Sequence, residues 1–209
     1  MRILHDLSIP VAPGTPEWPG DTPYSCGWSW EMSRGASVNV SALTTSPHVG
    51  THADAPLHVR PAAAASDALP LEAFCGRAFL LDVSGRPGLI ELETIDERLP
   101  SRLERLLLRT GCSVAGGTFP AGWPSLSATC VTALCARGLR LLGVDAPSVD
   151  PRHSQALDAH HALFDCGAFN LESLDLRGVP EGEHHLVALP WRLAGLDASP
   201  ARAVLVEPA

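Results

Sequence analysis

The sequence predicts a mixed α/β fold that contains more strand than helix. Most of its short apolar segments alternate apolar with polar residues, or are bounded by glycine and proline, which is typical of strands. Residues 105–145 supply a strand, a helix and a strand in succession, an order typical of α/β folds. Because no internal repeat or low-complexity linker interrupts the chain, we expect residues 1–209 to form a single domain.

The first half of the chain is predicted to consist of strands and loops. A first strand is expected at 3–9, followed by a loop rich in proline and glycine at 10–23. Strands at 28–33 and 38–44 flank a glycine turn, which predicts a hairpin. Three further elements are expected, namely an apolar strand at 78–83, a short helix starting with a capping box at Thr94, and a buried strand at 105–109.

The second half is predicted to hold the two main helices. Ser127 has the side chain of an N-cap and Gly138 is a typical C-terminal stop, so we expect a helix between them at 128–137. The long loop at 112–126 is expected either to form a wall of a binding pocket or to be a surface excursion. The remaining expected elements are a strand at 139–145, a helix at 154–164 and extended segments at 166–171, 184–189 and 203–207.

Composition and charge exclude several functional classes. The apolar fraction of 45% and the charged fraction of 18% are ordinary for a globular enzyme. A net charge of −8 argues against a nucleic-acid surface or a basic membrane helix. No segment has the apolar length of a membrane span or a signal peptide, so we expect a cytoplasmic protein. The six cysteines show no C-x-x-C spacing and are expected to be reduced thiols.

Residues 46–58 contain three of the nine histidines and one carboxylate. Pro56 has no N–H and would cost about 3 kcal/mol inside a helix, so it pushes its neighbours toward an extended conformation. In an extended chain, side chains two residues apart share a face, which places His52, Asp54 and His58 on one side. The segment is therefore predicted to present one polar face.

The histidine and carboxylate types in this segment are those of a metal site. Gly50 permits a sharp turn that brings His48 beside His52. Imidazole nitrogen and carboxylate oxygen suit borderline divalent cations such as zinc. Because no cysteine is nearby, we expect an open, catalytic kind of site that leaves a coordination position to water. The alternative is a loop whose histidines are only solvated or hydrogen-bonded.

The same segment resembles the signature of the metal-dependent cyclase family of amidohydrolases, most closely its bacterial kynurenine formamidases. The matching residues read His48-x-Gly50-Thr51-His52-x-Asp54-x-Pro56-x-His58. Seven positions are fixed in type and spacing in this signature. Further support comes from Trp18-Pro19-Gly20-Asp21, residues 143–150, His160 before Leu163-Phe164, Glu172 before Leu174, Leu189-Pro190 and residues 200–204.

The resemblance implies a fold, an assembly and a set of metal ligands. The fold would be a swivelling β/β/α domain with a mixed, barrel-like β-sheet flanked by a few helices, and the assembly a homodimer. Two divalent ions, most commonly Zn2+, would lie side by side in each subunit. Their ligands would be His48, His52 and Asp54 for the first ion, and Asp54, His160 and Glu172 for the second, with Glu172 also reaching the first. His161 remains an alternative to His160, one register away.

The resemblance also implies hydrolysis of N-formyl-L-kynurenine to L-kynurenine and formate in tryptophan degradation. Zinc lowers the pKa of water from about 16 toward about 7 and so supplies hydroxide for attack on the formyl carbon. His58 is expected to transfer a proton to the arylamine, because histidine titrates near neutrality. A third ligand is its alternative role.

Trp18 is expected to contact the substrate, as the tryptophan at the matching position does in the formamidases. Taken alone, the residue equally allows a packing role on the core. Two other functions remain open. One is hydrolysis of another aromatic or cyclic amide, such as an isatin-type lactam, and the other is a non-catalytic metal-binding or ligand-binding domain.

Overall fold

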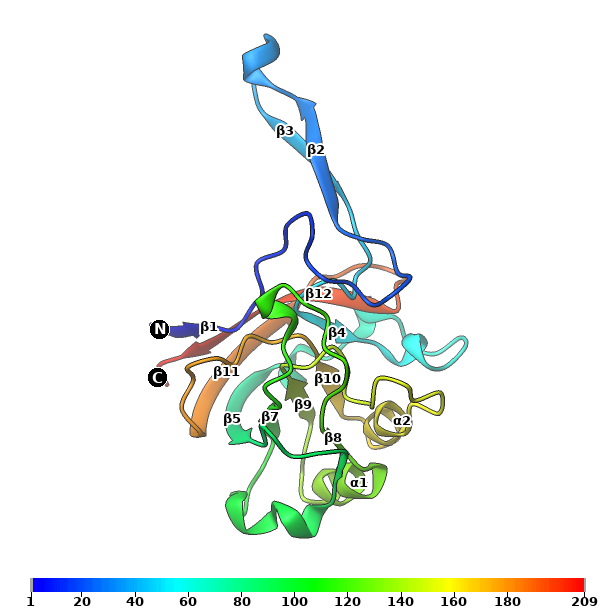
Figure 1. Ribbon diagram of the computed structural model, residues 1–209, viewed down its shortest axis with the longest axis vertical. Helices are drawn as coiled ribbons and strands as arrows, with labels where there is room; N and C mark the ends of the chain where they lie inside the picture. Colours follow the sequence, from blue (N-terminus) through cyan, green and yellow to red (C-terminus); the bar gives the residue numbers. More distant parts are fainter. Residues whose placement is uncertain (1, 209) are drawn as a thin grey trace.

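A curled mixed β-sheet forms the body of the protein, and a long hairpin projects from it (Figure 1). The structure is a computed structural model that describes residues 2–208. The strand order in the sheet is β1-β12-β11-β5-β7-β9-β10, with β4 paired to β12. The bounds are β1 (Ile3–Asp6), β4 (His52–Asp54), β5 (Cys75–Asp82), β7 (Arg105–Arg109), β9 (Leu141–Val144), β10 (Phe169–Leu171), β11 (Gly182–Pro190) and β12 (Ala198–Val206).

The sheet returns on itself at the predicted metal segment. β5, β7, β9 and β10 run parallel, whereas β11 and β12 are antiparallel to their neighbours. β4 pairs with the start of β12 on one side. On its other side, a single bridge joins His52 to Glu172, directly after β10. The predicted barrel-like sheet is thus confirmed, and the metal segment lies where its two ends meet.

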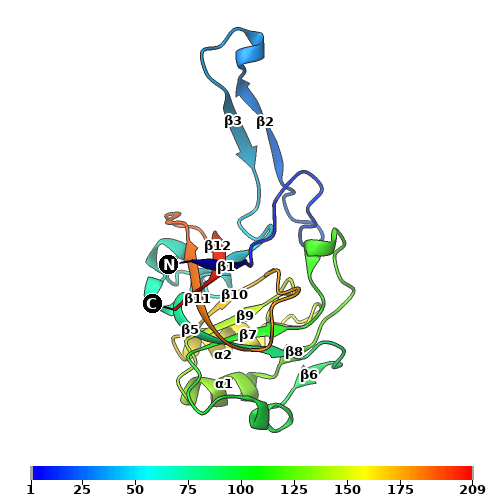
Figure 2. The same ribbon diagram turned by 90° about the vertical axis from the view of Figure 1, so that its left-hand side faces the viewer.

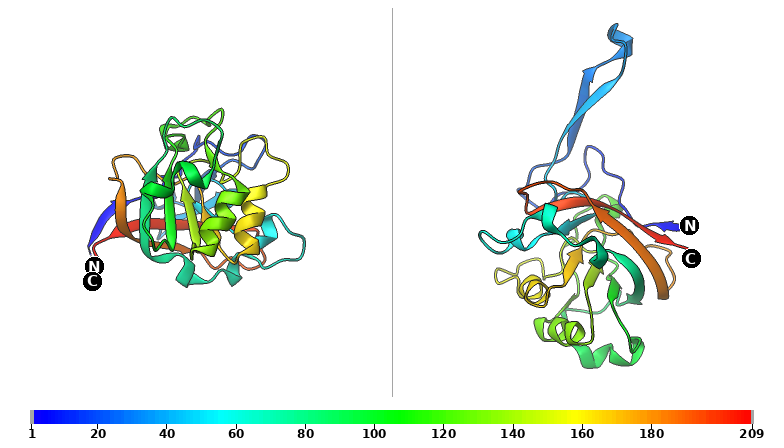
Figure 3. Two further views of the ribbon diagram at one scale, coloured as in Figure 1. Left: turned by 90° about the horizontal axis from the view of Figure 1, so that it is seen from below. Right: turned by 180° about the vertical axis from the view of Figure 1, so that it is seen from behind.

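Both faces of the central strands are buried. Side chains alternate across a strand. Leu106 and Leu108 of β7 therefore face the side of the sheet that the two helices cover, while Leu107 faces the opposite, concave side. The helices α1 (Ala128–Ala136) and α2 (Asp158–Asp165) lie side by side against the helical face (Figure 3). This double burial explains why β7 reads as a continuous apolar run.

The two helices differ in how well local sequence predicts them. For α1 the prediction is confirmed, because the Ser127 side chain accepts from the N–H of Cys130 and Gly138 adopts a φ of +106°. For α2 the predicted start is four residues early. The carboxylate of Asp150 accepts from the backbone N–H groups of Ala159 and His160, so a distant residue sets this helix start.

The predicted hairpin is confirmed as β2 (Ser25–Trp30) and β3 (Val40–Thr44), joined through a 3-10 helix at Met32–Arg34. It extends well away from the rest of the molecule (Figure 2). All residues of both strands are exposed, including Trp28 and Trp30. The hairpin therefore shares no core with the body.

Two segments differ from the local structure that the sequence predicts, namely the one around Thr94 and the loop 112–126. The helix predicted from Thr94 is wrong, since that segment forms two 3-10 helices, Leu92–Thr94 and Asp96–Arg98. The Thr94 hydroxyl donates back to the carbonyl of Glu91 instead of capping a helix. Within 112–126, β8 (Ser125–Leu126) pairs with β6 (Leu89–Ile90).

All six cysteines are free thiols, as predicted. Among residues 2–208, no helix combines the length and the apolar character needed to cross a membrane.

Candidate metal centre

The predicted ligands meet at the carboxyl ends of the parallel strands, the usual position of a site in an α/β sheet. Glu172 follows β10, and the loop that contains Asp150 follows β9. The loop after β7 adds Phe119 to the same edge. Because β4 is joined to this edge by the His52–Glu172 bridge, its side chains reach the same point.

The local structure of the histidine segment corrects one prediction. Only His52–Asp54 is strand, and Pro56–His58 forms a 3-10 helix, so His58 does not share the strand face of His52 and Asp54. Proline is tolerated at the first position of a helical turn, where its absent N–H is not needed. The turn is closed by the N–H of His58, which donates to the carbonyl of Ala55 at 2.9 Å.

The first predicted ligand set converges on one oxygen of Asp54. His48 Nδ1 lies 3.1 Å from Asp54 Oδ1, and His52 Nε2 lies 3.5 Å from the same oxygen. The turn that brings His48 back is the predicted one, with a φ of +76° at Gly50. One ligand atom from each of the three side chains lies within 4.8 Å of the other two.

The second predicted set converges on the other oxygen of Asp54. His160 Nε2 lies 3.1 Å from Asp54 Oδ2 and 3.3 Å from Glu172 Oε1. Glu172 Oε2 instead faces the first set, at 3.5 Å from His52 Nε2. Each carboxylate therefore divides its two oxygens between two groups of histidines. The His161 ring lies beside Arg60 instead, with its Nδ1 3.5 Å from Arg60 Nε.

Unpaired atoms at this point test whether a metal fits. Among residues 2–208, His52 Nε2 and Asp54 Oδ1 are buried and make no hydrogen bond of ordinary geometry, although His48 Nδ1 lies 3.1 Å from that oxygen. A buried polar atom without a partner is costly, and native structures rarely leave one without a reason. Because both atoms are donors to metals and face one another, a divalent cation between them satisfies both. The residues present fit the metal that the sequence predicts.

In each of the three histidines, the ring nitrogen that faces away from the predicted metal position is hydrogen-bonded to an oxygen. His52 Nδ1 bonds the carbonyl of Gly50 at 2.9 Å, and His160 Nδ1 bonds Asp150 Oδ2 at 2.6 Å. His48 Nε2 bonds Asp197 Oδ2 at 3.0 Å. Metal-ligating histidines almost always donate their second N–H in this way, which fixes the ring and leaves the other nitrogen to the ion.

The electrostatics of the site favour positive charge. Burial lowers the pKa of His48, but the adjacent carboxylates of Asp197 and Asp54 outweigh it and raise the pKa to about 10. Burial and the charge of Asp54 raise the pKa of Glu172, yet the adjacent imidazoles of His160 and His52 hold it at about 2. The carboxylates are thus ionised, and they bind either protons on the histidines or a cation.

A cavity of about 300 Å³ opens beside the two ligand groups. Trp18 lines it, is 39% exposed, and stands edge-on to Phe119 with ring centroids 5.5 Å apart. Trp18 also contacts Trp123, at 6.1 Å between centroids, so it both packs on other rings and faces the cavity. Through Phe119, the loop 112–126 forms a wall of the pocket, one of its two expected roles.

Comparison with known proteins decides the family. Residues 5–151 match the family model Cyclase, described as putative cyclase, which spans more than half of the chain. The protein belongs to the Cyclase family.

Solved structures similar to this Cyclase-family protein extend over almost all of it. A potential metal-dependent hydrolase with cyclase activity is 27% identical, with a TM-score of 0.83 and 98% of each chain covered. A predicted metal-dependent hydrolase from Bacillus stearothermophilus is also 27% identical, with a TM-score of 0.81 over 96% of each chain. An isatin hydrolase bound to thioisatinate, a product analogue, is 20% identical, with a TM-score of 0.83 over 98% of this chain and 92% of that one. The chain therefore has the fold of Cyclase-family metal-dependent hydrolases.

Sequence reasoning missed three polar residues that contact the predicted ligands. Asn170 donates its amide to Asp54 Oδ2 at 2.7 Å and to Glu172 Oε1 at 2.9 Å. Asp150 could have been identified, because it lies in the segment 143–150, which resembles the family. Asp197 offers no such signal, because it is 149 residues from His48 and lies in no recognised motif.

Proposed function

We propose that this protein is a metal-dependent arylformamidase that hydrolyses N-formyl-L-kynurenine to L-kynurenine and formate in tryptophan degradation. One observation carries the proposal. Asp54 and Glu172 each turn one oxygen toward His52 and the other toward His160. Carboxylates with two separately directed oxygens suit a pair of adjacent cations.

His48, His52, Asp54, His160 and Glu172 would hold two divalent ions, and their nitrogen and oxygen donors favour Zn2+. Such ions would lower the pKa of bound water to about 7 and would polarise an amide carbonyl. The protein contributes a buried site in which the ionised carboxylates of Asp54 and Glu172 would offset two of the four positive charges of the ions.

We assign proton transfer to His58. Its side chain is 31% exposed at the cavity, and its Nδ1 bonds Asp197 Oδ2 at 3.1 Å. Because Nδ1 is engaged, Nε2 is left to exchange a proton with the departing arylamine nitrogen. The edge-on rings of Trp18 and Phe119 offer an apolar wall to an aromatic substrate.

A second candidate is hydrolysis of an isatin-type cyclic amide. The similar fold of the isatin hydrolase and the aromatic wall of the cavity support it. Both reactions break an amide on an aryl nitrogen and use the same ligand groups, so the substrate distinguishes them.

The deciding experiment measures hydrolysis of N-formyl-L-kynurenine and of isatin by zinc-loaded, chelated and zinc-restored protein. We expect rapid release of L-kynurenine that is lost on chelation and returns with zinc. Turnover of isatin alone would move the proposal to the cyclic amide. Turnover of neither substrate by fully loaded protein would contradict it.

We further propose that the protein is a homodimer, assembled through the projecting hairpin. Residues 25–44 contain only two charged side chains, Glu31 and Arg34, which pair with each other at 3.4 Å. Two copies of this neutral, largely apolar hairpin can approach despite the net charge of −8 on each chain.

A further inference from the structure

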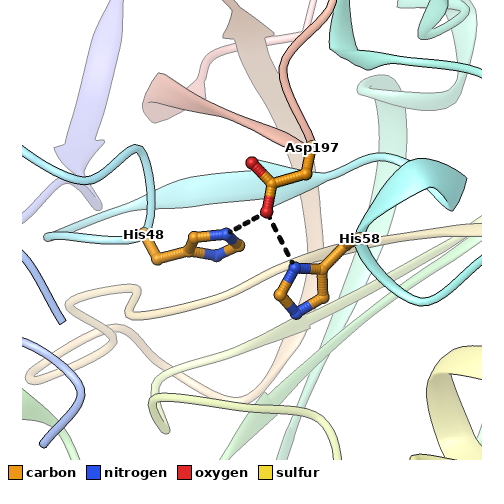
Figure 4. Close-up of side chains that lie close together, drawn as sticks. All are labelled: His48, His58 and Asp197. Carbon is orange, nitrogen blue, oxygen red and sulfur yellow. Dashed lines mark hydrogen bonds and ion pairs between the residues drawn. The ribbon is translucent and has the colours of Figure 1, made fainter. Parts of the chain in front are cut away.

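One oxygen of Asp197 contacts two histidines of the site (Figure 4). Oδ2 lies 3.0 Å from His48 Nε2 and 3.1 Å from His58 Nδ1. The two rings lie close together, with centroids 4.5 Å apart. Asp197 thus joins a predicted metal ligand to the predicted proton-transfer group.

The backbone fixes this arrangement through Ala55, which is fully buried. The N–H of Ala55 donates to the carbonyl of Asp197 at 2.8 Å, and its own carbonyl accepts from the N–H of His58 at 2.9 Å. Ala198, the residue after Asp197, pairs with Asp54 in the register of β12 and β4. Asp197 and His58 are therefore both fixed relative to the metal strand.

The bonds also determine which nitrogen of each ring carries hydrogen. An ionised carboxylate only accepts, so His48 Nε2 and His58 Nδ1 must both donate. The lone pair of neutral His48 then lies on Nδ1, the atom that faces Asp54. In His58 the second nitrogen, Nε2, points away from Asp197 (Figure 4).

We propose that Asp197 is a positioning residue that holds His48 as a ligand of the first ion and His58 as the proton-transfer group. The proposal rests on the proposed function, which gives these two histidines their roles. Its distinctive content is that one carboxylate supports two separate properties, metal affinity and turnover. Each property is supported through a different histidine, so the two contributions can be separated.

A competing role for Asp197 uses the same three side chains. Ligand atoms of His48, His58 and Asp197 lie within 4.8 Å of one another and have the chemistry of a cation site. The two roles differ in what they require of His58. If the three residues bind the ion, removing the His58 ring weakens zinc binding. If Asp197 is a positioning residue, removing the His58 ring leaves zinc binding intact.

The test combines zinc affinity with a double-mutant cycle on turnover, using Asp197→Ala, His58→Ala and the double variant. Competition with a chromophoric chelator gives the zinc dissociation constant, and turnover is measured at saturating zinc. We expect Asp197→Ala to weaken zinc binding and to lower turnover, each by about 10- to 100-fold. His58→Ala should lower turnover and leave zinc affinity unchanged. In the His58→Ala background, Asp197→Ala should still weaken zinc binding but lower turnover no further.

Two matched variants complete the test. Asp67 accepts from the N–H of Gly195, two residues before Asp197, so Asp67→Ala removes a contact of the same loop without touching a histidine. It should leave both readouts unchanged. Asp197→Asn keeps one oxygen that accepts both N–H groups and should retain part of the zinc affinity that Asp197→Ala loses. It also serves if Asp197→Ala does not fold.

Three results would overturn the proposal. The first is unchanged zinc affinity in both Asp197 variants. The second is an equal fall in turnover when Asp197 is removed with and without His58. The third is loss of zinc binding in His58→Ala, which would make His58 a ligand, either with His48 and Asp197 or with Asp54 and His160. If zinc-loaded wild-type protein does not hydrolyse N-formyl-L-kynurenine, the proposed function is wrong and the zinc constants alone decide the role of Asp197.

Discussion

At the scale of single residues, His48 and His160 bind either protons or metal. In His160, burial opposes protonation, but bonds to Asp150, Asp54 and Glu172 raise its pKa well above the ordinary value. The pKa of His48 is likewise raised, to about 10. Both rings are thus protonated at pH 7 in chelated protein, and each must lose a proton to bind an ion.

We therefore predict that zinc binding at pH 7 releases about one or two protons per chain. Zinc affinity should fall from pH 8 to pH 6, because lower pH strengthens the competing protonation. Calorimetric titration in buffers of different ionisation enthalpy measures the protons released. Zinc binding that releases no protons would show that these histidines are neutral in the chelated protein or are not the ligands.

A second prediction at this scale concerns the aromatic wall. Trp18→Ala removes a ring that lines the cavity, and should raise KM for N-formyl-L-kynurenine about tenfold, the equivalent of about 1.4 kcal/mol of lost contact. Trp18→Phe keeps a flat ring and should restore most of this loss. Steady-state kinetics at saturating zinc provides both values, and a wild-type KM in Trp18→Ala would exclude contact between this ring and the substrate.

At the scale of elements, the strand β9 is packed too tightly to accept a larger residue at Gly143. A Cβ added there would lie 2.6 Å from a methyl carbon of Leu107 and 3.0 Å from one of Leu174. Gly143→Ala should therefore lower the free energy of unfolding by about 1–3 kcal/mol. Gly122→Ala is the matched control, because a Cβ there meets nothing within 4 Å and the backbone has no positive φ. Urea denaturation compares the two, and equal stability would contradict the tight packing.

Elements were predictable where local sequence determines them. The hairpin, β7 and α1 follow from glycine turns, a buried apolar run and the Ser127 cap, all within a few residues. The start of α2 and the turn at His58 were not, because they depend on Asp150 and on a proline at the first position of a 3-10 helix. Local signals carry no information about partners that only the folded chain brings near.

The same distinction applies to the site. His48, His52 and Asp54 follow from spacing within one segment, since a strand and one glycine turn suffice to gather them. His160 and Glu172 required the family resemblance, because they join the site only through α2 and the bridge to β4. Asp197 reaches His48 through the register of β12 with β4, which no local pattern reveals.

At the scale of the whole molecule, the metal centre lies where the curled sheet meets its own first part. His52 and Asp54 come from β4, whereas His160 and Glu172 come from the chain that follows β9. Two isolated bridges, His52–Glu172 and Ser8–Leu174, link the backbone of the first part to the segment after β10. An ion shared by the side chains of both parts would add a further connection between them, so we expect metal binding to stabilise the folded chain.

The projecting hairpin is the surface on which the proposed homodimer rests. A two-stranded hairpin is marginally stable in water unless something covers it. Six large apolar side chains on it are exposed, namely Trp28, Trp30, Met32, Val38, Val40 and Leu43. A stable interface needs about 800 Å² from each partner, and a tryptophan alone buries about 150–250 Å², so these residues supply most of an interface.

We predict that replacing both hairpin tryptophans, in Trp28→Ser with Trp30→Ser, converts the proposed homodimer to a monomer. The expected dissociation constant rises by more than about 100-fold, because aromatic anchors dominate interface energies. Light scattering after size exclusion measures the mass, and zinc affinity should stay at the wild-type value since the hairpin shares no core with the ligand groups. Leu89→Ser is the control, because Leu89 is 57% exposed on the body of the molecule, outside the hairpin. A wild-type protein that is monomeric at micromolar concentration, or a double variant that remains dimeric, would exclude the hairpin as the dimer contact.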